Sequence, residues 1–437
     1  MFKDFYSVNI NISRHGGAAM ANGNKTVHIV GGGTVSHVRS HLAIAAPAYG
    51  NTARKLDELC RAHSDKLEVR LHLTRMAGGS LETDDDLLET NEDVAGLLDD
   101  LVADYSTKMV FMPVVLLDYS ASVVGADGLA ESGKYADRLK SREEAPLLQL
   151  SPTAKLIQKV RAARKDIFLV GFKTTAGARE DEQYVSGLHL LKEASCNLVL
   201  ANDTRTRTNM IITPEEARYH TTTNRDLALQ NLVEMTYLRS HLTFTRSTIV
   251  AGEPVAWRSE QVPEALRRVV DYCISVGAYK PFRGATVGHF AAKVDETTFL
   301  TSRRKTNFND LNKLGLVRIK TDGPDSVLAY GSKPSVGGQS QRIIFSQHPE
   351  YDSIVHFHCP IKQGSLVPTV SQREYECGSH ECGKNTSTGL ARFGDLSAVY
   401  LDQHGPNIVF NRTIDPQKVI DFIRDNFDLS KKTGGYV

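Results

Sequence analysis

An alternation of apolar runs and amphipathic segments through the first 245 residues restricts the fold more than any other feature. The apolar runs have the length and composition of buried strands, and they cover residues 26–31, 66–75, 108–121, 166–175 and 196–204. The amphipathic segments between them have helical spacing, and they cover residues 93–105, 151–164 and 180–195. Strands that alternate with helices in this way pair in parallel, with helices on both faces. We therefore predict an α/β fold for this half, a doubly wound, Rossmann-like parallel sheet.

The pattern changes near residue 245. Helical segments at residues 262–278, 340–349 and 415–427 are then mixed with short strand-like pieces at residues 289–302, 315–320, 327–335, 353–359 and 398–410. This second half is predicted to be α+β. Because 437 residues exceed one ordinary core, we expect separate domains. They are a polar lead-in at residues 1–25, a first domain at residues 26–245 and a second at residues 246–437.

Charge and composition exclude some classes of protein. Lys and Arg total 52 against 51 Asp and Glu, so no net field favours nucleic acid or an anionic membrane. No apolar run approaches the roughly 18 residues that span a bilayer, and residues 1–25 lack the apolar core of a signal peptide. The six cysteines are scattered, which is typical of reduced thiols in a cytoplasm. We expect a cytoplasmic protein without nucleic-acid or membrane partners.

Two histidines, His356 and His358, stand one residue apart in the apolar run at residues 353–359. Residues i and i+2 of a strand face the same side, so both imidazoles can reach one metal ion. The pair alone is also typical of two half-buried strand histidines. A third histidine would complete a catalytic zinc site with one open position, and His404 is the first candidate because it leads from a strand into a Gly-Pro turn. The other candidates are His289, His348 and His380.

The surrounding sequence resembles the class II aldolase/adducin family, of the zinc-dependent fuculose-phosphate-aldolase type, over about residues 260–430. The family's segments occur here in the same order, as GHFAAKV, FLTSRRKTNFNDL, GSKPS, HPEYDSIVHFHC and DQHG. The resemblance implies an αβα domain and a zinc ion bound by His356, His358 and His404.

The resemblance breaks at the family's catalytic base. The glutamate that takes a proton falls near Gly337 to Gln339, where this chain has no carboxylate. An amide or a glycine cannot accept a proton. Either another group supplies the base, with Glu376, His380 and Glu381 as candidates, or the aldol chemistry has been lost and the loop around these residues is a structural turn.

The family's phosphate site also has counterparts in this chain. Ser302, Thr306 and Ser335 stand at matching places, and Lys305 adds positive charge. Turn amides, hydroxyls and cations together form an anion cradle, although an exposed basic turn has the same sequence character. The resemblance thus implies a phosphorylated or acidic carbonyl substrate, whose carbonyl oxygen zinc would polarise.

Three glycines follow the first predicted strand, in HIVGGGTVSHVR, and we expect a helix after this turn. Such a turn lets the backbone approach a phosphate closely, but the spacing is not G-x-G-x-x-G, and glycine turns also serve packing. The order GGT, VR, GKYADRLK, GFKTT and ANDT resembles phosphopantothenate–cysteine ligases of the coenzyme A pathway over about residues 26–245. The resemblance implies ATP or CTP as a ligand. The implied nucleotide site contains Gly32, Gly33, Thr34, Arg39, Arg138, Lys140, Ala201, Asn202 and Asp203.

This chain also departs from the ligase pattern in one segment. The ligases follow VR with T-N-x-S-S-G, whose asparagine helps to activate the acyl intermediate. Here Ala43 falls at the asparagine position, and Ala45, Ala46 and Pro47 replace the S-S-G residues. An apolar loop cannot donate the same hydrogen bonds, so the usual ligation of cysteine to phosphopantothenate is not expected.

Three hypotheses follow. The favoured one is a bifunctional enzyme, a zinc-dependent aldolase-type lyase fused to a ligase-like nucleotide-binding domain, with a small phosphorylated substrate. The second is a non-catalytic scaffold or ligand sensor that keeps both folds. The third is a phosphopantothenate–cysteine ligase with an accessory C-terminal domain. The two resemblances imply a homo-oligomer, either the tetramer of the aldolases or the dimer of the ligases.

Overall fold

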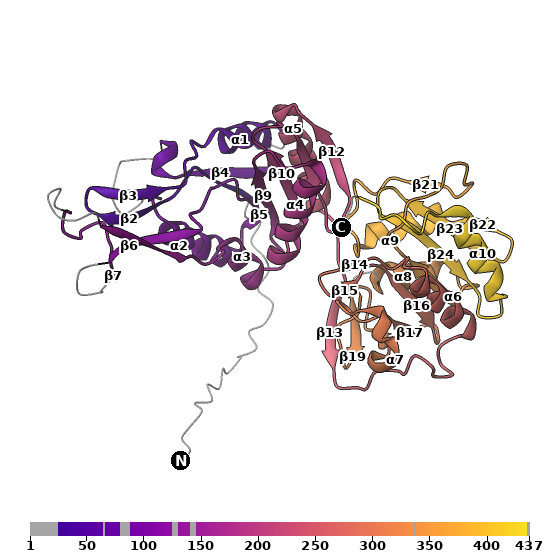
Figure 1. Ribbon diagram of the computed structural model, residues 1–437. Coiled ribbons are helices and arrows are strands. Elements are labelled where there is room, and N and C mark those ends of the chain that lie inside the picture. The colour runs from indigo at the N-terminus through magenta and orange to yellow at the C-terminus, as the bar shows by residue number, and fades with distance from the viewer. Residues whose placement is uncertain are drawn as a thin grey trace, which may run out of the picture.

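The computed structural model describes residues 25–63, 66–78, 88–124, 130–139, 146–335 and 338–434. The chain forms two lobes (Figure 1), which we call the N-terminal lobe (residues 25–240) and the C-terminal lobe (residues 246–434). Each lobe contains its own large sheet, and one hydrophobic cluster of the N-terminal lobe also includes Phe282 of the C-terminal lobe. The architecture is therefore mixed α/β, as the sequence predicts, while the exact domain boundaries stay a prediction.

The N-terminal lobe is built on a seven-stranded sheet in the order β12-β11-β10-β9-β5-β1-β4. Five strands are parallel, and β11 and β12 join them antiparallel. The strands are β1 (Lys25–Gly31), β4 (Leu67–Leu73), β5 (Thr107–Phe111), β9 (Phe168–Thr175), β10 (Leu198–Asp203), β11 (Asn209–Ile212) and β12 (Arg218–Thr222). Every residue of β1 after Lys25 is buried, which explains why the parallel strands are apolar throughout and not alternating.

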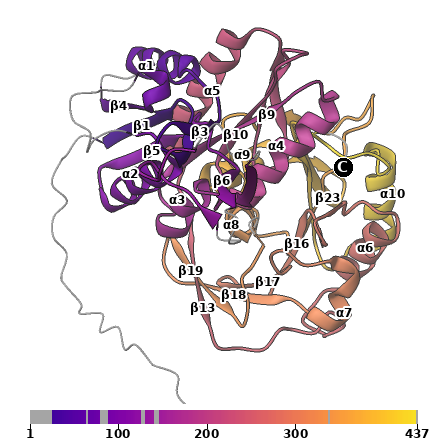
Figure 2. The same ribbon diagram turned by 60° about the vertical axis from the view of Figure 1, so that its left-hand side comes forward.

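Helices cover both faces of this sheet. Figure 2 shows strands β4, β1 and β5 between helix α1 on one side and helix α2 on the other. One hydrophobic cluster lies under α1 and α5, and a second lies under α2, α3 and α4. The helices are α1 (Asn51–His63), α2 (Asn91–Ala103), α3 (Ile157–Ala163), α4 (Glu180–Ala194) and α5 (Arg225–Ser240). Thr90 begins α2 with a reciprocal capping box that includes Asp93.

Three local predictions for this lobe were wrong. Residues 108–121 do not form one strand, because β5 ends at Phe111 and Pro113 cannot donate to a continuing ladder. The helix expected from residue 151 begins only at Ile157. The glycine turn leads into a two-stranded ribbon and not directly into a helix. The additional strands are β2 (Val35–Arg39), β3 (Leu42–Ala45), β6 (Tyr119–Val124), β7 (Ala130–Glu131) and β8 (Leu147–Pro152), of which the last three form a separate sheet.

The C-terminal lobe is built on a ten-stranded, mainly antiparallel sheet, in which β20 lies between β16 and β24. Its strands are β13 (Arg246–Val250), β16 (His289–Lys293), β17 (Thr298–Thr301), β18 (Val317–Thr321), β19 (Ser326–Tyr330), β20 (Ser353–His356), β21 (Thr369–Val370), β22 (Ala391–Phe393), β23 (Leu396–Leu401) and β24 (Gly405–Phe410). A short hairpin of β14 (Pro281–Phe282) and β15 (Ala285–Thr286) stands apart.

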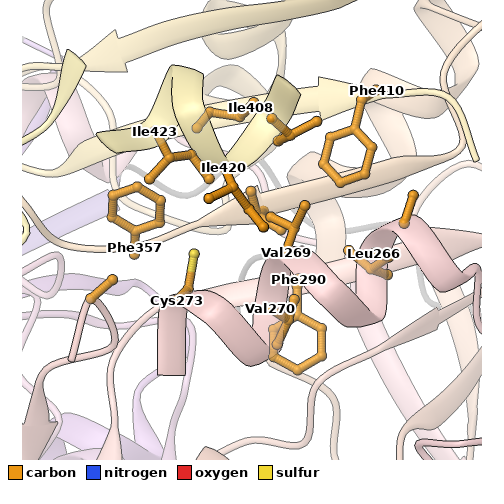
Figure 3. Close-up of a cluster of buried hydrophobic side chains, with 14 of the residues drawn as sticks. Leu266, Val269, Val270, Cys273, Phe290, Phe357, Ile408, Phe410, Ile420 and Ile423 are labelled. Carbon is orange, nitrogen blue, oxygen red and sulfur yellow. The ribbon is translucent and has the colours of Figure 1, made fainter. Parts of the chain in front are cut away.

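Helices on both faces complete the predicted αβα layers. Helices α6 (Glu264–Ser275) and α10 (Pro416–Asn426) enclose the larger cluster, in which Leu266, Phe290 and Ile423 meet (Figure 3). On the other face, α8 (Gly338–Gln347) covers a smaller cluster that contains Ile344 and Ile354, and α9 (His380–Gly389) packs beside α8. The remaining short helix is α7 (Leu311–Leu314). Among the helices that the structure describes, none has both the length and the apolar character needed to cross a bilayer.

The α6–α10 cluster should dominate the stability of the C-terminal lobe. Ile423 is fully buried in it, so Ile423→Ala is expected to lower the free energy of unfolding of this lobe by about 2–5 kcal/mol. Urea unfolding followed by tryptophan fluorescence reports on this lobe, because Trp257 is the chain's single tryptophan. Ile249→Ala is the matched control, since Ile249 is 54% exposed. An equal loss in both variants would contradict this assignment of the core.

Candidate functional site

Three histidines meet where β20 ends beside the turn between β23 and β24. His356 is the last residue of β20, and its neighbours across the sheet are His289 on β16 and Asn407 on β24. His358 follows just beyond the end of the strand, and His404 lies in the turn that precedes β24. The expectation that both histidines of the pair lie on one strand is therefore correct only for His356.

A glycine allows this turn to approach the end of β20. Gly405 has a φ of 137°, and a Cβ atom at this position would overlap the carbonyl oxygen of Phe357. Only glycine combines this φ with so close a contact. The His-Gly order in the sequence thus has a geometric basis, because Gly405 lets His404 lie against His358.

The three imidazoles form a compact cluster. Their ring centroids lie 4.5 Å apart for His356 and His404, 4.8 Å for His358 and His404, and 5.1 Å for His356 and His358. One nitrogen from each ring lies within 4.8 Å of the others, and all three side chains are buried. Among the residues that the structure describes, no other set of three His, Cys, Asp or Glu side chains has this geometry.

The nitrogens of this cluster are suited to a metal ion. His356 Nδ1 lies 2.8 Å from the Pro406 carbonyl oxygen, which only accepts, so the proton is on Nδ1 and Nε2 carries a lone pair. That Nε2 lies 3.2 Å from His404 Nε2. Two nitrogens bound tetrahedrally to one zinc ion are about 3.3 Å apart, given Zn–N bonds of about 2.0–2.1 Å. The residues present therefore fit zinc.

Burial keeps these imidazoles neutral, which is the form that binds metal. Burial lowers the pKa of His356 to about 4, and the Pro406 carbonyl offsets only part of this shift. Burial also holds the pKa of His358 and His404 well below the ordinary value, and the neighbouring histidines lower it further. Moreover, the Nδ1 atoms of His358 and His404 are buried without a hydrogen-bond partner among the described residues.

The other histidine candidates lie outside this cluster. His289 stacks on His356 with ring centroids 4.6 Å apart, but its Nδ1 is bonded to the amide of Gln341. His348 is bonded to Ser387, and His380 is bonded to the Thr245 hydroxyl at 2.6 Å. The positions Gly337 to Gln339, where the family's base falls, lie outside the described side chains.

Of the three predicted bases, Glu381 and His380 bind the segment that joins the two lobes. Glu381 accepts hydrogen bonds from the backbone amide and the hydroxyl of Thr243. The backbone amide of His380 donates to the carbonyl oxygen of Thr243 at 2.9 Å. Both residues thus have structural partners on the connecting segment.

Glu376 has different surroundings. Its Oε2 accepts from Asn197 Nδ2 of the N-terminal lobe at 3.0 Å. Burial raises the pKa of Glu376 to about 7, although the Asn197 hydrogen bond and the charge of Arg239 act in the opposite direction. The charge of Arg239 also lowers the pKa of His404.

A carboxylate that the sequence did not single out lies beside the histidines. Glu216, in the turn between β11 and β12 of the N-terminal lobe, has its Oε2 3.9 Å from His358 Nδ1. Lys192 of α4 and Lys432 of the C-terminal segment lie 3.1 and 2.6 Å from its oxygens. Burial opposes ionisation of Glu216, but the two lysines outweigh it and lower its pKa. No local motif marks this residue, because it reaches the site only through the packing of the two lobes.

The predicted phosphate-binding residues form a turn that carries several cations. Ser302 is buried with no hydrogen-bond partner for its hydroxyl among the described residues, and the Ser335 amide donates to the Ser302 carbonyl oxygen. The Thr306 hydroxyl donates to the Arg303 carbonyl oxygen. The charge of Arg304 lowers the pKa of Lys333, and Lys165 of the N-terminal lobe and Lys305 add to this effect.

The predicted nucleotide-binding residues are engaged within the N-terminal lobe. The Thr34 hydroxyl donates to Asn91 Oδ1, and the Arg39 guanidinium bonds to the Glu131 carbonyl oxygen and carboxylate. Asp203 accepts from four backbone amides, those of Gly177, Ala178, Arg205 and Thr206. A Cβ atom at Gly32 would overlap the Thr74 hydroxyl, and one at Gly33 would overlap the Ala46 carbonyl oxygen.

The other residues of the predicted nucleotide site have fewer polar contacts within the lobe. Ala201 is buried in β10, Asn202 accepts from the Thr174 hydroxyl, and Arg138 is exposed. Lys140 lies outside the described residues. Nucleotide binding by this set stays a prediction.

Neither the known protein-family models nor the curated proteins include a match to this sequence. Among solved structures, the chain is similar to a DNA/pantothenate metabolism flavoprotein from Streptococcus pneumoniae, with 20% identity over 48% of this chain and 97% of that one, at a TM-score of 0.41. The C-terminal domain of a coenzyme A biosynthesis bifunctional protein matches with 14% identity over 49% and 95%, at a TM-score of 0.35. An L-fuculose 1-phosphate aldolase matches with 14% identity over 38% and 85%, at a TM-score of 0.29. The two resemblances seen in the sequence are thus also found among solved structures.

The raised pKa of Glu376 predicts a pH-dependent stability. Between its ordinary pKa of 4.5 and its folded value of about 7, the folded protein keeps a proton that the unfolded chain has released. The contribution of this group therefore becomes less favourable as the pH rises through that window. Glu376→Gln removes the charge, so its melting temperature should rise relative to wild type from pH 4.5 to 7 and then level off. The effect is at most about 3 kcal/mol, and smaller to the extent that water reaches the carboxyl.

Melting curves of both proteins across this pH range provide the measurement. Glu350→Gln is a suitable control, because the Glu350 side chain is 59% exposed and the substitution removes a carboxylate at the surface. A melting difference between wild type and Glu376→Gln that does not change with pH would show that Glu376 titrates normally.

Proposed function

We propose that this protein is a zinc-dependent lyase of the aldolase type, which acts on a phosphorylated or acidic carbonyl compound and carries a ligase-like N-terminal domain. The observation that supports this most strongly is the buried cluster of His356, His358 and His404. Three neutral imidazoles, two of which have a nitrogen without a hydrogen-bond partner among the described residues, are costly to bury unless a ligand compensates them. A scaffold protein would have no use for such a cluster.

The three histidines would hold zinc and leave one position for the substrate. Zinc, when bound, would polarise the substrate's carbonyl oxygen and stabilise negative charge that develops on it. His356 is held in the right orientation by the Pro406 carbonyl oxygen, which keeps its Nε2 directed at His404.

A cluster of positive charges would bind the acidic group of the substrate. Arg304, Lys305 and Lys333 of the C-terminal lobe form this cluster with Lys165 of the N-terminal lobe. No carboxylate forms an ion pair with any of them within the described part of the chain. The mutual repulsion of these cations would be relieved by a bound phosphate or carboxylate. The buried Ser302 hydroxyl adds an unused hydrogen-bond donor in the same turn.

Glu376 would accept and return the proton in the reaction. A base works best when its pKa lies near the working pH, and burial raises the pKa of Glu376 to about 7. Glu381 and His380, by contrast, have partners on the connecting segment. Among the three candidates for the missing base, Glu376 therefore has the most suitable environment.

The N-terminal lobe would bind a nucleotide, ATP or CTP, as the ligases do. The internal bonds of Thr34, Arg39 and Asp203 would then shape the site, and backbone amides near Gly32 and Gly33 would face the phosphates. We further propose that the protein is a cytoplasmic homo-oligomer with a small phosphorylated substrate.

Metal analysis tests the proposed centre. Purified wild-type protein should contain about one zinc ion per chain by mass spectrometry. His356→Ala/His358→Ala should lose this zinc, because two of three ligands are absent. His348→Ala should keep it, since His348 is bonded to Ser387 outside the cluster. If wild-type protein remained metal-free even after dialysis against zinc, the lyase proposal would be wrong and a scaffold role would replace it.

A thermal-shift measurement tests the nucleotide site. A nucleotide at about 100 times its dissociation constant should stabilise the folded protein by about 2.7 kcal/mol. We expect ATP or CTP to raise the melting temperature, and adenosine, which has no phosphates, to leave it unchanged. Absence of any shift with both nucleotides would contradict this part of the proposal.

A further inference from the structure

Glu216 has an unusual position for a charged residue. Its side chain is 1% exposed, and its backbone lies in the left-handed region with a φ of 68°. The Thr213–Ala217 turn holds it there through backbone hydrogen bonds, and the Tyr184 hydroxyl donates to the Glu216 carbonyl oxygen at 2.6 Å. The fold thus fixes this residue from several directions and directs its carboxylate into the boundary between the lobes.

The groups that surround this carboxylate come from three parts of the chain. Lys192 Nζ of α4 lies 3.1 Å from Oε1. Lys432 Nζ, near the end of the described chain, lies 2.6 Å from Oε2. His358 Nδ1 of the histidine cluster lies 3.9 Å from the same Oε2. Each carboxylate oxygen has a further lone pair beside its ion pair with a lysine, so both have acceptor capacity left.

We propose that Glu216 is a positioning residue of the metal centre, whose carboxylate accepts the Nδ1 proton of His358 and so turns the Nε2 atom of that ring toward His356 and His404. This inference rests on the proposed metal site. It makes the centre a joint product of both lobes, because the three ligands come from the C-terminal lobe and the carboxylate comes from the N-terminal lobe.

A comparison of His356 with His358 supports this role. His356 already donates its Nδ1 proton to the Pro406 carbonyl oxygen. His358 Nδ1 has no hydrogen-bond partner within the described residues, and Glu216 is the acidic group that lies near it. The 3.9 Å separation is longer than a hydrogen bond, so the bond requires one of the two side chains to move toward the other. Histidine ligands of metal ions generally donate their second N–H to a carboxylate or a carbonyl oxygen.

The charges around the histidines give a second reason to assign this role to Glu216. A divalent cation at the histidines would lie near two ammonium groups, those of Lys192 and Lys432, because both are paired with the carboxylate that lies 3.9 Å from His358 Nδ1. Without Glu216, these like charges would oppose metal binding. The Glu216 carboxylate stands between the lysines and His358, where its negative charge offsets them.

Zinc affinity in the full-length protein tests this role. Competition with a chromophoric chelator should show that Glu216→Gln binds zinc about 10–100 times more weakly than wild type. Glu216→Asp keeps the charge and should recover part of the affinity. The Co²⁺-substituted Glu216→Gln protein should also show an altered visible spectrum, because the His358 ring is no longer held in place.

Glu215→Gln is the matched control. It removes the adjacent carboxylate, which is bonded to the buried guanidinium of Arg239 at 2.5 Å, and should lower the melting temperature. It leaves His358 and Glu216 in place, so zinc affinity should stay within about threefold of wild type. If both variants lost affinity equally, the role of Glu216 would be merely structural, and if Glu216→Gln kept full affinity, the inference would be wrong.

The metal-free protein gives a readout that does not depend on zinc. In ¹⁵N-histidine spectra of wild type, His358 should carry its proton on Nδ1, and Glu216→Gln should abolish this preference; His358→Ala identifies the signal. A wild type that binds no zinc but shows this tautomer would overturn the proposed function and leave the Glu216–His358 contact intact. Protonation of His358 on Nε2 in wild type would overturn the inference itself.

Discussion

The buried guanidinium of Arg239 is the interaction on which the relation of the two lobes depends. It lies at the end of α5 in the N-terminal lobe, is 1% exposed, and donates to the Glu215 carboxylate. The same side chain donates to the carbonyl oxygens of Gln372 and Arg373 in the C-terminal lobe. An unpaired buried charge costs several kcal/mol, so the lobes cannot separate or slide without exposing or orphaning it. A planar guanidinium with several donors suits such a three-way junction better than a lysine would.

This fixed contact has consequences for the histidine cluster. Glu215 and Glu216 are adjacent in a turn whose backbone is held by its own hydrogen bonds, and Glu215 faces Arg239 while Glu216 faces His358. From the other side, Thr433 donates through its amide to the His358 carbonyl oxygen and through its hydroxyl to the His404 carbonyl oxygen. The candidate site is therefore enclosed by a turn of one lobe and the last described residues of the other.

The sequence predicts those parts of the fold and site that depend on local pattern. Apolar runs predicted the parallel strands, and the His-x-His pair with a later His-Gly predicted the three histidines that the structure brings together. The prediction of one strand at residues 108–121 was wrong because hydrophobicity alone does not reveal where a strand leaves its sheet, although Pro113 was a signal. Glu216 could not be predicted, since nothing in TPEEARYH distinguishes a surface glutamate from one that faces another lobe.

Two of the residues that the sequence suggested as bases hold the segment that connects the two lobes. Glu381 and His380 are bonded to Thr243 and Thr245, in the short segment between α5 and β13, and so fix the direction in which the chain enters the C-terminal lobe. Gln341, the buried polar group near the family's base position, presents an amide to His289, and an amide cannot take up a proton. The acidic group nearest the histidines among the described residues is instead Glu216 at the boundary between the lobes, and Glu376 also lies at this boundary, bonded to Asn197. A covalent connection of fixed direction keeps the N-terminal lobe at a high effective concentration beside the histidines. The proposed metal centre, which would combine a carboxylate from one lobe with imidazoles from the other, is thereby contained in a single chain.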